Sequence, residues 1–170
     1  MFGNQPKIEV KPNDFDRKLI LVGWLLVAVN FIVVLSFYFT LPETIPTHFN
    51  LKGEADGFGS KSTLWILPIF NLVMYFGMTM LATKMKPWNY NYPTKVTAKN
   101  APILYAMSIR MLVWLNLGIA LVFLVISAHT ILLAREINTM DIGWLIIVLV
   151  AVLTIGPFIA IYKMFKVPKQ

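Results

Sequence analysis

The sequence contains no cysteine, and only 14% of its 170 residues are charged. Without cysteine the chain forms no disulfide, no thiolate metal site and no cysteine nucleophile, so thiol redox chemistry is excluded. Hydrophobic residues make up 58% of the chain. A water-soluble domain of this length rarely combines so few charges with so many apolar residues, so we expect a lipid bilayer to be its solvent.

Sequence motifs of hydrolytic enzymes are also absent. The chain has no H-E-x-x-H metalloprotease motif and no G-x-S-x-G nucleophile elbow. No pair of carboxylates falls within its long apolar segments. We therefore predict no catalytic residues and no enzymatic activity.

Four long segments of the chain are almost free of charge. A bilayer core about 30 Å thick needs about 20 helical residues at a rise of about 1.5 Å each, and all four segments are long enough. Every backbone polar group in lipid must be hydrogen-bonded within its own segment, so these segments are expected to be helices. We predict an all-α integral membrane protein whose four-transmembrane-helix bundle occupies residues 19–163. The spans are expected at about 19–41, 62–83, 102–134 and 142–162.

Lysine and arginine residues are divided unevenly between the two sides of this bundle. Twelve of the 15 lie on one side: four before the first span, four between the second and third spans, three after the fourth span, and Arg110 near the start of the third span. The positive-inside rule then places both termini in the cytoplasm and the 42–61 loop outside. The net charge of +7 is therefore explained by the orientation of the chain in the membrane and by attraction of its basic residues to anionic lipid head groups. We expect no nucleic-acid partner.

The loop between the first two spans is the part of the chain richest in proline, glycine and ionisable residues together. With Leu41 before it, it reads LPETIPTHFNLKGEADGFGSK. Prolines favour extended backbone before them, and the glycines permit tight turns, so we predict a structured outer loop. Because a reversal at Gly53 would bring residues on either side together, we also expect His48 to contact Asp56.

This loop resembles a motif of the bacterial membrane family known as domain of unknown function 1648, which includes SdpI-like immunity proteins. The resemblance rests on nine residues in order and spacing: Leu41, Pro42, Ile45, Pro46, His48, Phe49, Gly53, Asp56 and Lys61. It implies a small multi-pass protein of the plasma (inner) membrane. In SdpI-like members it further implies protection against a secreted peptide toxin and signalling to a cytoplasmic regulator.

Candidate functional residues concentrate in the same loop. His48, Asn50, Glu54, Asp56 and Lys61 are predicted to bind a ligand or to anchor the loop. Two further residues are expected to contact these side chains and hold them in place without touching the ligand. These are His129, near the outer end of the third span, and Glu43.

Two functions remain open for this loop. The first is binding of an extracellular ligand, a cationic or amphipathic peptide, because the outer side of the chain is net negative. The second is a divalent-metal site of a sensor or hydrolase built from His48, Glu54 and Asp56, with or without His129, because imidazole is a common metal ligand. Under the first function no cofactor is expected. Because the usual spacings of zinc ligands are absent, the favoured alternative for His48 is that it hydrogen-bonds a loop carboxylate and holds the loop's shape.

Four polar residues fall within the predicted spans: Asn30, Asn71, Asn116 and Arg110. An amide in lipid needs a partner, and Asn30 and Asn71 have similar depths in neighbouring antiparallel spans, so we predict contact between them. No acidic residue falls within any predicted span. Arg110 is therefore expected to extend to the cytoplasmic interface without an acidic partner.

Overall fold

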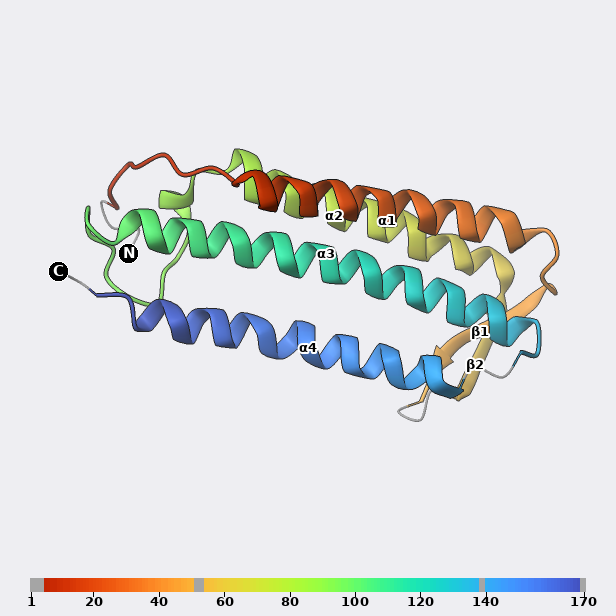
Figure 1. The fold of residues 1–170 in the computed structure, drawn as a ribbon. Helices are drawn as coiled ribbons and strands as arrows, with labels where there is room; N and C mark the ends of the chain where they lie inside the picture. The colour runs from red at the N-terminus through yellow and green to blue at the C-terminus, as the bar shows by residue number, and fades with distance from the viewer. Residues whose placement is uncertain (1–4, 51–53, 138–139, 169–170) are drawn as a thin grey trace.

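A computed structural model describes residues 5–50, 54–137 and 140–168, with backbone only at 140–142. Four long helices run side by side: α1 (Asp14–Tyr38), α2 (Ile66–Lys84), α3 (Ala101–Ala134) and α4 (Met140–Phe165) (Figure 1). All four are long and apolar enough to cross a membrane, α2 together with the 3-10 turn η1 (Lys61–Trp65) before it. The chain is therefore a mostly helical, multi-pass membrane protein, as its composition predicts.

The two ends of the bundle differ in structure. Both chain termini and the α2–α3 connection lie at one end, here called the terminal end (Figure 1). This connection contains a short 3-10 turn, η2 (Pro87–Asn89). The other end, here called the hairpin end, carries two antiparallel strands, β1 (Thr44–Phe49) and β2 (Ala55–Ser60). The strands lie where the sequence predicts a structured loop.

Helix α3 is the element on which the others pack. Helices α1, α2 and α4 all contact it, as does β1. The outward faces of the helices carry many exposed large apolar side chains, among them Leu25 and Ile32 on α1, Phe76 on α2 and Phe158 on α4. Such a continuous apolar surface would be unstable in water and is what a helix presents to lipid.

The contact between α1 and α2 depends on a glycine. The ring of Tyr75 lies directly against Gly23, where any side chain would clash with it. The Tyr75 hydroxyl donates to the carbonyl of Ile20 at 2.8 Å, and its ring meets Trp24 edge-on with centroids 5.0 Å apart. Gly23 thus permits the approach that lets a buried tyrosine satisfy its hydroxyl on the neighbouring helix.

Helix α1 begins before the uncharged segment that predicts it. Asn13 caps it: its Oδ1 accepts from the backbone N–H of Asp16 at 2.8 Å, and Asp16 Oδ2 accepts from the Asn13 N–H at 3.1 Å. This reciprocal capping box puts the charged residue Asp16 in the first turn. Its other oxygen accepts from Arg110 Nε of α3 at 3.2 Å. The expectation that Arg110 lacks an acidic partner is therefore wrong.

The amides in the spans are buried, but their partners differ from the prediction. Asn71 Nδ2 donates to the carbonyl of Ala120 at 3.4 Å, and Asn116 Nδ2 donates to the Tyr75 carbonyl and to Thr79 Oγ1, both at 3.1 Å. Asn30 is fully buried, and its amide has no hydrogen-bond partner among the described residues. The contact predicted between Asn30 and Asn71 is therefore not made as a hydrogen bond: Asn71 donates to a backbone carbonyl of α3, and neither amide oxygen has a partner within the described ranges.

Because Asn116 has hydrogen-bond partners and Asn30 has none in the part of the chain that the structure describes, replacing each by alanine should lower the free energy of unfolding by different amounts. Asn116→Ala should lower the free energy of unfolding by about 1 kcal/mol more than Asn30→Ala, because only Asn116 loses hydrogen bonds while both lose the same amide volume. Reversible unfolding of the purified protein in mixed detergent micelles measures both. Equal losses, or a larger loss for Asn30→Ala, would contradict the hydrogen-bond assignment.

Candidate functional site

The motif segment forms a β-hairpin across the hairpin end of the bundle. Its strands pair Thr44 with Ser60, Ile45 with Gly59 and Pro46 with Phe58, and further on His48 with Gly57. The register shifts on either side of His48, an irregularity of the bulge type that re-aims side chains locally. The turn expected at Gly53 lies outside the described residues.

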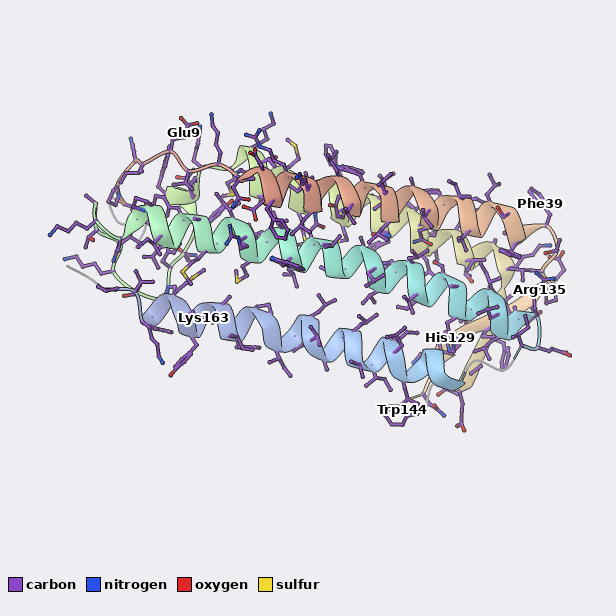
Figure 2. All side chains as sticks on the ribbon, in the orientation of Figure 1. Glu9, Phe39, His129, Arg135, Trp144 and Lys163 are labelled. Carbon is purple, nitrogen blue, oxygen red and sulfur yellow. The ribbon has the colours of Figure 1, made fainter. Side chains whose placement is uncertain are left out.

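One strand of the hairpin is fixed on the helices. Ile45 is 1% exposed and packs in a cluster of buried apolar side chains from four elements of the structure. The other members of this cluster are Val34, Leu41, Leu64 and Ile131. The ring of Phe49 lies against the ring of buried His129 of α3, with centroids 5.0 Å apart. The structure thus places His129 directly beneath β1, and Figure 2 shows it at the hairpin end of α3.

Hydrogen bonds and ion pairs close the hairpin at its base and near its tip. At the base, Lys61 Nζ lies 2.9 Å from Glu43 Oε1 and 5.5 Å from the centre of the Tyr38 ring. Near the tip, Asn50 Nδ2 donates to Glu54 Oε2 at 2.8 Å, and the Glu54 N–H donates to Asn50 Oδ1 at 3.0 Å. Four of the predicted loop residues therefore form two pairs that hold the hairpin's shape.

The predicted contact between His48 and Asp56 is present. His48 Nδ1 lies 2.5 Å from Asp56 Oδ1, and both side chains are exposed to solvent. Gly57 makes room for this arrangement, since a Cβ placed there would lie 2.9 Å from the Cβ of His48. His48 is thus packed closely against Gly57 of β2, and its imidazole contacts Asp56, the residue before that glycine.

Five exposed side chains of the hairpin are here called, together, the hairpin face. It consists of Thr47, His48, Glu54, Asp56 and Phe58. Phe58 is 64% exposed. Sequence reasoning missed this residue, although a single aromatic between two glycines, Gly57 and Gly59, gave a usable signal. The hairpin face therefore combines acidic groups, an imidazole and an uncovered aromatic ring on a fixed backbone.

The candidate metal ligands do not converge. Asp56 is paired with His48, whereas the Glu54 carboxylate accepts from Asn50. Throughout the part of the chain that the structure describes, no three His, Asp or Glu residues gather closely enough to hold a metal ion. The predicted metal triad of His48, Glu54 and Asp56 is thus not assembled, with or without His129.

Comparison with known proteins identifies the region that carries this site. Residues 25–72 match the family described as a domain of unknown function (DUF1648), which confirms the resemblance deduced from the motif. The matched segment runs from α1 through the hairpin into α2 and includes every residue of the hairpin face. An uncharacterized protein of Archaeoglobus fulgidus is 35% identical over 74 residues, which cover 43% of this chain and 39% of that protein. No solved structure matches the chain.

The close packing of His48 on β2 predicts the effect of adding one methyl group. Gly57→Ala should push His48 away from Asp56 and loosen the hairpin, so that proteinase K cleaves it about tenfold faster in lipid nanodiscs. Gly77→Ala on α2 is the matched control, because a Cβ there meets no atom within 4 Å. Equal cleavage of the hairpin in both variants would show that Gly57 does not position His48.

Proposed function

We propose that this protein resides in the plasma membrane with both termini in the cytoplasm, and that its hairpin face binds a cationic, amphipathic peptide outside the cell. The observation that carries the proposal is an acidic and aromatic surface held on a fixed hairpin. By resemblance to SdpI-like proteins, the consequence of binding is immunity to a peptide toxin or a signal to a cytoplasmic regulator.

The orientation is supported by the distribution of basic residues. Twelve of the 15 lysine and arginine residues lie toward the terminal end in sequence, and three lie toward the hairpin end. A cytoplasmic terminal end satisfies the positive-inside rule, and the hairpin then projects from the outer surface.

The chemistry of the ligand is inferred from which charges at the hairpin end are available. The two described basic side chains there are already engaged: Lys61 is largely buried against Glu43, and the Arg135 guanidinium lies 5.3 Å from the centre of the Phe37 ring. The carboxylates of Glu54 and Asp56 contact Asn50 and His48, but both acidic residues remain exposed to solvent. Complementary charge speeds encounter with a cationic ligand, and an exposed ring such as Phe58 supplies an apolar anchor.

The fixed backbone of the hairpin favours binding because little ordering is needed when a ligand arrives. Ile45 is buried among side chains of α1, η1 and α3, and Phe49 packs on His129. A preorganised surface loses less conformational entropy on binding than a flexible loop. Contact with α3 also gives the hairpin a physical link to the terminal end, since α3 is 34 residues long.

Binding is tested with a fluorescein-labelled lysine–leucine amphipathic peptide and the full chain in zwitterionic nanodiscs. Phe58→Ala should weaken binding about tenfold, because it removes the apolar anchor and leaves the hairpin's ion pairs in place. Phe39→Ala is the matched control, since Phe39 is an exposed aromatic at the same end but outside the hairpin. Fluorescence anisotropy measures both, with empty nanodiscs subtracted. Equal affinity of both variants and the wild type would refute the proposed site.

Orientation is tested separately with single cysteines, which the natural sequence makes straightforward because it has none. Thr47→Cys on the hairpin should react with an impermeant maleimide in intact cells, and Lys95→Cys in the α2–α3 connection should react only after lysis. Both positions are exposed in the structure. The opposite labelling pattern would place the hairpin in the cytoplasm and rule out an extracellular ligand.

A further inference from the structure

A groove of about 990 Å³ separates α3 from α4 over part of their length. The two helices meet closely at Gly118, where a side chain would clash with Leu153. Its lining is almost entirely apolar and includes the small residues Ala106 and Ala160 beside larger ones such as Met107, and residues of α1 line it as well. A Cβ at Gly156, another lining residue, would meet no atom within 4 Å. The groove is therefore an apolar channel at bilayer depth.

The charged groups in the groove are of one sign. Among its described lining residues two are charged, Arg110 and Lys163, and both are basic. Lys163 lies in the last turn of α4 at the terminal end (Figure 2) and has no ion pair with a described residue. The Nε–H of Arg110 donates to Asp16, while the Arg110 side chain remains 51% exposed. The guanidinium therefore has further N–H groups available to an acceptor.

We propose that this groove binds one anionic phospholipid, with its acyl chains against the apolar walls and its phosphate on Arg110 and Lys163. An apolar channel matches the chains, and a basic end matches the headgroup at the depth where a phosphate lies. Arginine binds phosphate oxygens through its planar fork, and lysine adds a point charge. This inference is independent of what the hairpin binds.

A zwitterionic lipid would fill the apolar channel equally well, but it leaves two cations facing a headgroup of no net charge. A second copy of the chain could also cover the groove. It would have to supply both an apolar ridge and an acidic group at the terminal end. Charge complementarity therefore favours the anionic lipid, and the other two occupants are distinguished by experiment.

The direct test is native mass spectrometry of the full chain titrated with phosphatidylglycerol or with phosphatidylcholine. Each basic group near a membrane surface favours an anionic lipid by about fivefold in affinity, so the wild type should prefer phosphatidylglycerol by about that factor or more. Lys163→Gln should lose about fivefold in affinity for phosphatidylglycerol and clearly less for phosphatidylcholine, because the cationic choline of phosphatidylcholine already offsets its phosphate. Lys84→Gln is the matched control, since Lys84 lies in the last turn of α2 and does not line the groove.

A second variant tests the acyl-chain channel without altering charge. Gly156→Leu fills the groove with a side chain that has room there, and it should weaken both lipids. Gly77→Leu places the same side chain at an equally open glycine of α2 that does not line the groove, and it should weaken neither. Equal affinity of the wild type for both lipids would overturn the proposal. So would unchanged phosphatidylglycerol binding by Gly156→Leu, or a wild-type dimer that Gly156→Leu dissociates.

Discussion

Burial of Ile45 is the interaction on which the hairpin depends. A two-stranded sheet is marginally stable by itself and needs a surface to pack on. Ile45 provides that attachment by entering a cluster formed with Val34 of α1, Leu64 of η1 and Ile131 of α3. The opposite strand pairs with β1 and carries the exposed residues Asp56 and Phe58. Everything displayed on the hairpin face is therefore positioned by a contact that lies beneath it.

Helix α3 carries this support through the bundle. Its hairpin end packs under β1 through His129 and Ile131, while its terminal end holds the chain termini. There the Tyr105 hydroxyl donates to the Pro6 carbonyl at 2.8 Å, and Asn100 Nδ2 donates to the Pro168 carbonyl at 3.2 Å. The Tyr92 hydroxyl lies 3.0 Å from Ser108 Oγ of α3, and burial raises the pKa of Tyr92, so this hydroxyl stays protonated at alkaline pH values at which an exposed tyrosine ionises. The same helix thus connects both ends of the molecule.

The spans and one contact of the hairpin could be predicted from the sequence, whereas the partners of the buried polar residues and the groove could not. The spans follow from long uncharged segments, and the contact of His48 with Asp56 is predicted because Gly53 permits a reversal between them. The partner of Asn71 is a backbone carbonyl, which any residue type supplies and which therefore leaves no sequence signal. The partner of Arg110 is hidden because a capping box extends α1 past the uncharged segment. The groove depends on how far α3 and α4 diverge, which composition does not encode.

Hydrogen–deuterium exchange on the full chain in nanodiscs tests most directly whether the hairpin is a fixed surface. If Ile45 holds it on α3, the backbone amides of 44–49 and 55–60 that pair between strands should exchange about a hundredfold more slowly than in an unstructured chain. Ile45→Ala should remove that protection while the four helices keep theirs, because it deletes a buried side chain outside the spans. Exchange of the wild-type hairpin at the unstructured rate, with the helices protected, would contradict the account.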